Sequence, residues 1–215
     1  MTELDDWLTR IGEVHPVKWD LGLQRVASVA QEMDLVHPAK QVVLVAGTNG
    51  KGSTVEFLAR FARAAGLSVG KSTSPHLHHF NERIVVNDVA SSDELIVDAF
   101  RHIDHARGST TLTYFEFATL ASLYIFSKLS LDLAILEIGL GGRLDAMNIV
   151  DPDLSIITSI SLDHEAWLGN SREAIAFEKA GIMRSSVPYI VSDWAPPATL
   201  LTHAFNLNVP LDLIG

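Results

Sequence analysis

The sequence has no cysteine among its 215 residues, and its 16 lysines and arginines are outnumbered by 26 aspartates and glutamates. Without cysteine the chain forms no disulfide, thiolate-ligated zinc site or iron–sulfur cluster, and it has no thiol nucleophile. A formal net charge of -10 disfavours a general nucleic-acid-binding protein, which carries a basic face. The sequence lacks the run of ~20 apolar residues that crosses a bilayer, and its acidic first residues do not resemble a signal peptide. We therefore expect a cytoplasmic protein with no nucleic-acid or membrane partner.

Apolar runs that alternate with helical patterns indicate the fold class. Runs rich in Val, Ile and Leu predict strands at 41–46, 67–73, 83–89, 132–138, 154–160 and 188–193. Helical spacing of apolar residues predicts helices over about 4–11, 23–33, 53–65, 92–107, 114–128, 172–180 and 197–206. The dipeptide Asn87-Asp88 is typical of a turn. This alternation predicts an α/β fold with a mostly parallel sheet, helices on both faces and a ligand site at the carboxyl ends of the strands.

Hydroxyl side chains stand where three of these helices are predicted to begin. Ser91 with Glu94, and Thr113 with Glu116, have the spacing of capping boxes. Ser171 is the expected N-cap of a third helix.

The sequence shows no internal repeat, no low-complexity tract and no linker rich in Pro, Gly or Ser. We therefore expect residues 1–215 to form a single domain. Residues 209–215 are apolar and strand-like, so we expect the sequence to be part of a larger protein.

A glycine-rich turn, GTNGKGS at 47–53, connects a predicted buried strand to a helix. Its backbone N–H groups can surround phosphate oxygens, and Lys51 adds a positive charge for the terminal phosphates. Gly52 stands between Lys51 and Ser53, which is a departure from the usual phosphate-binding loop. Ser53 or Thr54 could reach a metal ion. The residues predicted to bind ATP are Gly47, Thr48, Asn49, Gly50, Lys51, Gly52 and Ser53.

Acidic and basic residues follow two other predicted strands. Glu137 ends the strand 132–138, where an acid is placed to hold Mg²⁺, and Arg143 in the next glycine-rich turn could pair with an anion. The alternative for Glu137 is a solvated strand end. His164 also follows a strand, but a lone histidine is more often structural, and Mg²⁺ prefers oxygen ligands.

Other candidates have simpler explanations. His76, His78 and His79 lie close together in the sequence but lack a fourth zinc ligand at a clear spacing. The simplest role of Glu116 is that of capping partner of Thr113, and we expect this role whether or not Glu116 has another.

Six motifs, taken together, resemble those of folylpolyglutamate synthases in the Mur ligase superfamily. They are GTNGKGST, SPHL with FNERI, LTYFEFATL, LEIGLGGRLDAMN, SLDH and EKAGI, in that order, and the resemblance covers about residues 17 to 193. The spelling is most similar to the bacterial kind that also has dihydrofolate synthase activity. The resemblance implies a fold like the central domain of Mur ligases. It also implies that such enzymes continue for about as many residues again.

The resemblance further implies roles for individual residues. Ser74, Glu137 and His164 would be ligands of Mg²⁺, with two ions in all, so Ser74 replaces Ser53 as the preferred hydroxyl ligand. Lys179 would be carbamylated and would act in catalysis with Lys51 and His164. The implied substrate-binding residues are Asp20, Leu21, Gly22, Leu23, Thr113, Tyr114, Phe115, Glu116, Arg143, Leu144, Asp145 and Ala146.

The implied reaction ligates L-glutamate to dihydropteroate and to reduced folates through an acyl phosphate made from ATP, by an enzyme expected to be a monomer. Four alternatives stay open. They are a folylpolyglutamate synthase without dihydropteroate activity, a cell-wall amino-acid ligase, a small-molecule kinase with the same phosphate-binding loop, and a fragment that binds ligands without turnover.

Overall fold

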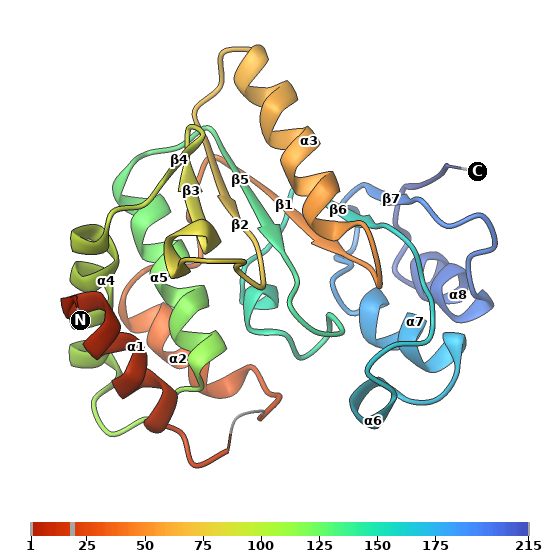
Figure 1. Ribbon diagram of the computed structural model, residues 1–215. Helices are drawn as coiled ribbons and strands as arrows, with labels where there is room; N and C mark the ends of the chain where they lie inside the picture. Colours follow the sequence, from red (N-terminus) through yellow and green to blue (C-terminus); the bar gives the residue numbers. More distant parts are fainter. Residues whose placement is uncertain (1, 18–19, 215) are drawn as a thin grey trace.

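An eight-stranded sheet runs through the described residues, 2–17 and 20–214, of the computed structural model (Figure 1). Its order is β4-β3-β2-β5-β1-β6-β7-β8. The strands are β1 (Gln41–Ala46), β2 (Val69–Ser72), β3 (Ile84–Val86), β4 (Val89–Ala90), β5 (Leu133–Glu137), β6 (Leu154–Ile157), β7 (Tyr189–Val191) and β8 (Leu211–Leu213). The β2–β3 and β3–β4 pairs are antiparallel and the other pairs are parallel. The predicted mostly parallel sheet is confirmed.

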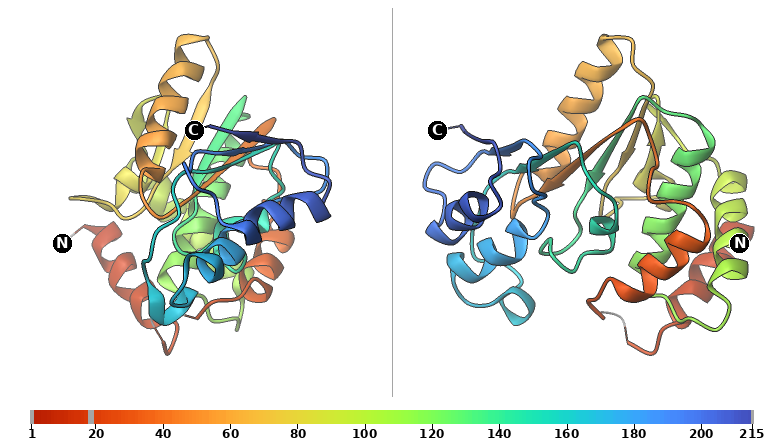
Figure 2. Two further views of the ribbon diagram at one scale, coloured as in Figure 1. Left: turned by 90° about the vertical axis from the view of Figure 1, so that its right-hand side faces the viewer. Right: turned by 180° about the vertical axis from the view of Figure 1, so that it is seen from behind.

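Helices cover both faces of the sheet, as predicted, but unequally (Figure 2). They are α1 (Glu3–Glu13), α2 (Gln24–Glu32), α3 (Lys51–Ala64), α4 (Asp93–Arg107), α5 (Tyr114–Lys128), α6 (Glu165–Leu168), α7 (Arg172–Ala180) and α8 (Ala198–Asn206), with 3-10 helices η1 (Phe80–Arg83) and η2 (Ala146–Ile149). Within the described residues, α3 alone supplies helix side chains to a small core on one face. The larger core on the other face includes side chains of α1, α2, α4, α5, α7 and α8.

Strand β1 is apolar from Val42 to Ala46 because this part lies between the two cores. Val43 and Val45 belong to the small core with α3, whereas Leu44 and Ala46 belong to the large one. Neighbouring strand residues point to opposite faces, so a central parallel strand needs apolar residues at every position. This explains why the run 41–46 could be recognised as a buried strand.

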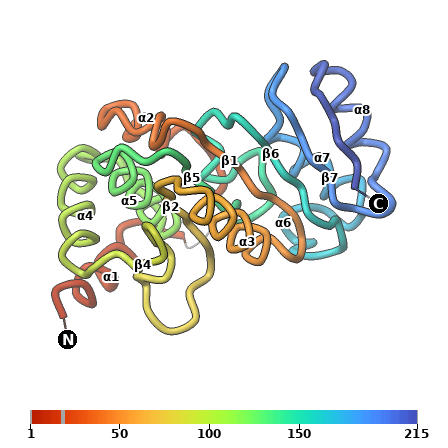
Figure 3. Tube along the Cα trace, turned by 90° about the horizontal axis from the view of Figure 1, so that it is seen from above, coloured from red at the N-terminus to blue at the C-terminus, as the bar shows by residue number. Residues whose placement is uncertain are grey.

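Helix α5 is the most enclosed helix of the described part. Its residues 116–126 are all buried, and Figure 3 shows it between α4 and the sheet. Its amino-terminal cap is the predicted one, because Thr113 Oγ1 accepts from the Glu116 N–H (3.2 Å) and Glu116 Oε2 accepts from the Thr113 N–H (2.7 Å). The Ser171 cap of α7 is also confirmed.

The predicted capping box of Ser91 with Glu94 is wrong by one residue. Ser92 is the N-cap of α4, and its Oγ accepts from the Leu95 N–H at 3.4 Å. Ser91 instead completes the hairpin that precedes the helix: its N–H donates to Ile84 O (2.8 Å) and its carbonyl accepts from Asn81 Nδ2 (2.8 Å). Those long-range bonds hold Ser91 outside the helix.

Several predicted boundaries move by a few residues. The strand predicted over 83–89 is a hairpin of β3 and β4, and its turn at Asn87-Asp88 has positive φ at both residues, as expected for that dipeptide. The strand predicted over 154–160 ends at Ile157. Helix α1 continues past Gly12 to Glu13, and the strand-like end contains β8, although Gly215 lies outside the described residues.

No helix of the described residues combines the length and the apolar character that would be needed to cross a membrane.

The cap of α4 gives a matched pair of variants. We expect Ser92→Ala to lower the free energy of unfolding by about 1 kcal/mol, because an N-cap hydrogen bond is lost. Ser91→Ala should change it by less than about 0.5 kcal/mol, or stabilise the chain, because the buried Ser91 hydroxyl has no hydrogen-bond partner among the described residues. Urea unfolding of both variants measures this, and equal losses would contradict the assignment of the cap.

Candidate functional site

The glycine-rich turn leaves the carboxyl end of β1 and leads into α3. Gly47 has φ 146°, and a Cβ there would lie 1.8 Å from Thr158 Oγ1, so the turn has no room for a larger residue. Gly50, at φ 83°, is the N-cap of α3, and no side chain caps that helix. The first N–H groups of α3 therefore keep their capacity to bind an anion.

The segment that follows β6 clamps this turn from the side. Thr158 Oγ1 donates to Asn49 O (2.6 Å), and the Thr48 N–H donates to Ser159 O (2.6 Å). Thr48 Oγ1 also donates to Ser161 O at 3.1 Å. Thr158, Ser159 and Ser161 are not among the predicted site residues. Their position directly after a buried strand could have indicated that they lie at the site. The clamp orients the turn before any ligand arrives.

One cavity of about 690 Å³ brings together two groups of predicted residues. Gly50, Gly52 and Ser53 line it from α3, and Ser74 and Glu137 line it from the ends of neighbouring strands. A Cβ at Gly52 would lie 3.6 Å from Glu137 Oε2, so the start of α3 is close to this carboxylate.

Glu137 is a buried carboxylate at the end of β5, with only 4% of its surface exposed. Burial raises the pKa of Glu137, while the Ser74 N–H bond (3.2 Å) and the charges of Lys51 and Arg83 partly offset the rise. Within the described residues the Ser74 hydroxyl has no hydrogen-bond partner. A free hydroxyl beside a carboxylate is an oxygen donor set that suits Mg²⁺. Thr54 suits it less, since its hydroxyl donates to Gly50 O.

His164 lies elsewhere, in a crevice of about 20 Å³ that also contains Lys51, Asp163 and Lys179. The structure therefore separates the three predicted metal ligands. Ser74 and Glu137 line the large cavity, whereas His164 lines the crevice together with Lys179. The His164 side chain is half exposed, and Nε2 lies 3.7 Å from Asp163 Oδ2.

Lys179 is a buried cation in that crevice, with 3% of its surface exposed. Burial and the like charge of Lys51 lower the pKa of Lys179 to about 8, although Asp163 and Asp145 oppose the shift. A substantial fraction of this amine is therefore neutral near physiological pH.

The turn after β5 contains Arg143, Leu144, Asp145 and Ala146, all expected to contact substrate. The buried Asp145 carboxylate accepts from the Leu140 N–H (2.8 Å) and the Met147 N–H (2.9 Å), so it fastens its own turn. Burial raises the pKa of Asp145 to about 6 despite these bonds. Arg143, expected to be open to an anion, instead pairs with Glu178 at 2.8 Å.

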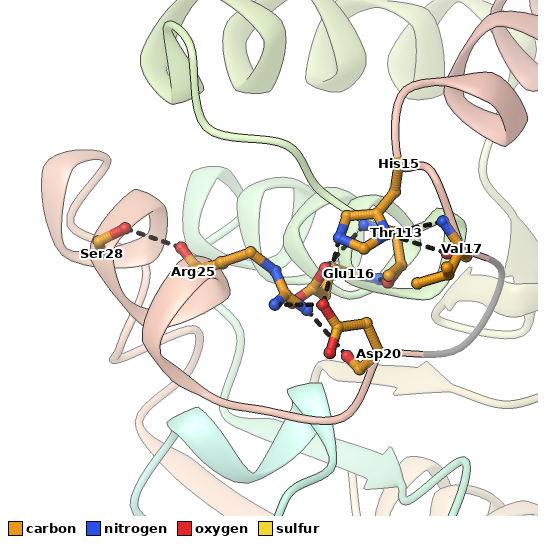
Figure 4. Close-up of polar contacts among 7 residues, drawn as sticks. All are labelled: His15, Val17, Asp20, Arg25, Ser28, Thr113 and Glu116. Atoms are coloured by element: carbon orange, nitrogen blue, oxygen red, sulfur yellow. Dashed lines mark hydrogen bonds and ion pairs between the residues drawn. The ribbon is translucent and has the colours of Figure 1, made fainter.

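A polar network connects the two other expected substrate segments (Figure 4). Arg25 Nη1 donates to Asp20 Oδ2 (2.7 Å), and Nη2 donates to Glu116 Oε1 (3.2 Å). His15 Nε2 lies 3.3 Å from the same Asp20 oxygen. Glu116 thus holds both its capping bond and an ion pair, and Arg25, which the sequence analysis missed, joins segment 20–23 to the start of α5.

Tyr114 and Phe115 are consecutive aromatic residues at the start of α5, and we call them the aromatic wall. A Cβ at Gly139 would lie 2.5 Å from the Phe115 ring, so this glycine allows the ring to approach the strand end. The Tyr114 ring packs edge-on against Phe80 at 6.0 Å. Phe115 thus lies beside the end of the strand that carries Glu137, and both residues line one narrow crevice.

In the histidine-rich segment, His76 is engaged with an arginine. His76 Nδ1 accepts from Arg83 Nε at 2.8 Å. In the part of the chain that the structure describes, no three His, Cys, Asp or Glu side chains are grouped as a metal site.

Comparison with known proteins gives a consistent result. The Mur ligase middle domain family matches residues 45–192. The dihydrofolate synthase/folylpolyglutamate synthase of Haemophilus influenzae is 47% identical over 205 residues, which cover 95% of this chain and 47% of that protein. The chain thus spans about half the length of the curated relatives it matches.

Solved structures agree with this comparison. The structure of E. coli FolC in complex with DHPP and ADP superimposes with a TM-score of 0.97 at 45% identity. The match covers 99% of this chain and 51% of the FolC chain. A bifunctional folylpolyglutamate synthase/dihydrofolate synthase of Yersinia pestis, complexed with AMPPNP and Mn ion, gives 0.94 at 44% identity, over 99% of this chain and 52% of that one. On this evidence the chain belongs to the Mur ligase middle domain family.

Proposed function

We propose that this chain supplies the ATP- and folate-binding part of a ligase that joins L-glutamate to dihydropteroate and to reduced folates. The observation that carries the proposal is the single cavity in which an uncapped helix start and a glycine turn face Ser74 and Glu137. The likeness to relatives named dihydrofolate synthase/folylpolyglutamate synthase supports the choice of substrates.

The glycine turn binds the phosphates of ATP. Lys51 Nζ lies at the turn and donates to Gly47 O (2.9 Å) and Thr48 O (3.2 Å), so its charge is within reach of a phosphate placed on the start of α3. The net charge of -10 repels anionic substrates. Local cations must therefore outweigh the field of the whole chain.

The reaction begins when a carboxylate oxygen of the acid attacks the γ-phosphorus of ATP. A new P–O bond forms, the bond to the bridging oxygen breaks, and ADP leaves. The amine of glutamate then attacks the acyl carbon, loses a proton and expels phosphate. The first step brings two anions together, so positioning and charge neutralisation dominate its catalysis.

Ser74 and Glu137 would hold one Mg²⁺, and His164 with carbamylated Lys179 would hold a second. Bound there, the ions would supply positive charge to the phosphoryl oxygens. The aromatic wall of Tyr114 and Phe115, with segments 20–23 and 144–146, would hold the ring system of the folate substrate.

Lys179 is suited to carbamylation. A neutral amine attacks carbon dioxide and releases a proton, and the lowered pKa of Lys179 makes that neutral form available. The product carries a negative charge in place of a positive one. The modification would therefore end the repulsion between Lys179 and Lys51 and create an oxygen ligand beside His164.

Two other functions make different predictions. A folylpolyglutamate synthase without dihydropteroate activity would bind tetrahydrofolate but not dihydropteroate. A small-molecule kinase would stop after phosphoryl transfer, and glutamate would leave its product formation unchanged. Phe115, which lines a crevice together with Glu137, favours a ligase of aryl acids over the kinase.

Calorimetric titration of this chain tests the proposed function. We expect the chain to bind both Mg-ATP and dihydropteroate. Lys51→Ala should weaken the binding of Mg-ATP by about 10- to 100-fold, the scale of one charged hydrogen bond. Lys40→Ala is the matched control, because that exposed lysine pairs with Asp132 at the other end of β1. Binding of tetrahydrofolate alone would favour the first alternative, and no binding of Mg-ATP would refute the proposal.

The metal assignment predicts that Glu137→Gln weakens Mn²⁺ binding in the presence of AMPPNP by at least ~10-fold. Glu56→Gln is the control: Glu56 lines the same cavity but already pairs with Lys71 and Arg60. Electron paramagnetic resonance of free Mn²⁺ measures both. Equal affinities in the two variants would remove Glu137 from the metal site.

The pKa of about 8 for Lys179 predicts that its carbamylation depends on pH. About half of the amine is neutral at pH 8 and roughly 3% at pH 6.5. With ¹³C-bicarbonate we expect a carbamate NMR signal at pH 8.5 that weakens strongly at pH 6.5. The signal should vanish in Lys179→Met and persist in Lys128→Met, and a signal that survives in Lys179→Met would contradict the assignment.

A further inference from the structure

Arg83 stands apart from the other arginines of the sequence. Within the described residues it forms no ion pair, and only its Nε donates a hydrogen bond, to His76 Nδ1 at 2.8 Å. Every other arginine pairs with a carboxylate: Arg10, Arg25, Arg60, Arg63, Arg101, Arg107, Arg143, Arg172 and Arg184. The two terminal nitrogens of Arg83 are therefore open to a ligand.

The guanidinium of Arg83 lies beside two aromatic rings, and its charge is only partly compensated. It lies 5.8 Å from the ring centres of both Phe80 and Tyr114. Burial lowers the pKa of Arg83, and Tyr114 and Glu137 only partly offset this. An arginine nevertheless stays protonated in a protein. A half-buried cation without a counter-ion is costly, and an anionic ligand would remove that cost.

The acids near Arg83 are engaged elsewhere. Glu82 accepts from the backbone N–H groups of Leu77, His78 and His79, which lower the pKa of Glu82 to about 2. Glu137 accepts from the Ser74 N–H. The charge of Glu137 acts on Arg83, but among the described residues neither carboxylate forms an ion pair with it.

Arg83 also lines a narrow crevice of about 10 Å³, together with Phe115 and Met147. Thr73, Ser74 and Glu137 line both this crevice and the 690 Å³ cavity, so the two adjoin. The crevice has space for about one water-sized group. None of the glycine-turn residues lines it.

We propose that Arg83 binds the carboxylate of the acid that is to be ligated, and that it is a substrate-binding residue of the reaction. This inference rests on the proposed function. The planar fork of a guanidinium matches a carboxylate with two parallel hydrogen bonds. The aryl part of the acid would then lie against Phe115.

The position of Arg83 favours a carboxylate over a phosphate of ATP. The glycine turn and Lys51 offer the phosphates a separate place at the start of α3, and the crevice suits a carboxylate oxygen better than a phosphoryl group. The acid thus approaches Glu137 from the side of α5, and ATP approaches it from the side of α3. Arg83 reduces the repulsion between the two anions as they meet.

Calorimetry with two ligands and a set of variants tests this. The ligands are 7,8-dihydropteroate and its carboxamide, which keeps the rings but has no charge. We expect the unmodified chain to bind the acid about 10- to 100-fold more tightly than the amide, and Arg83→Gln to abolish that preference. Arg83→Lys should retain part of it, because the charge remains but the fork is lost. Arg101→Gln, at an exposed arginine of α4 that pairs with Glu3, should leave it unchanged.

Each other outcome overturns the inference in a recognisable way. A loss of affinity for acid and amide alike in Arg83→Gln would mean that Arg83 only supports the aromatic wall. Weaker binding of Mg-ATP with unchanged binding of the acid would place Arg83 in the nucleotide site. If the unmodified chain binds Mg-ATP but neither the acid nor the amide, the proposed folate function fails as well.

Discussion

Parallel pairing of β1 with β5 and β6 is the constraint on which the site depends. The register sets Val45 opposite Glu137 and Ala46 opposite Ile157, so three strands end at one edge of the sheet. The glycine turn, the Glu137 carboxylate and the clamp at 158–161 all leave from that edge. A parallel sheet buried on both faces leaves little freedom for these ends to move. The turn, the carboxylate and the clamp are therefore arranged at this edge before any ligand is bound.

Burial of charge gives this edge its chemical character. Glu137 has a raised pKa and Lys179 a lowered one, both because burial disfavours the charged form. Arg83 lies beside the rings of Phe80 and Tyr114 and has no ion-pair partner in the part of the chain that the structure describes. Charges in such surroundings interact more strongly than they would in water. A chain with an acidic surface can in this way present a local positive field to anionic substrates.

Sequence patterns predicted the parts of the site that depend on local rules. The Thr113 cap, the glycine turn and the buried strands follow from hydrogen-bonding capacity, backbone freedom and side-chain period over a few residues. The Ser91 cap failed because bonds to Ile84 and Asn81 decide where that serine belongs. The clamp by Thr158 and the bridge by Arg25 were missed for the same reason, since each joins residues far apart in the chain.

The amino-acid sequence by itself determined the α/β alternation and the position of the glycine-rich turn. It also indicated the candidates Glu137 and His164, to which the family resemblance added Lys179. Only the tertiary structure decided which of them share a space: Ser74 lies with Glu137, and His164 lies with Lys179. It alone also showed that Arg143 is paired with Glu178 while Arg83 has no carboxylate partner among the described residues. Propensity acts over a few residues, whereas desolvation and ion pairing depend on neighbours that only the folded chain brings together.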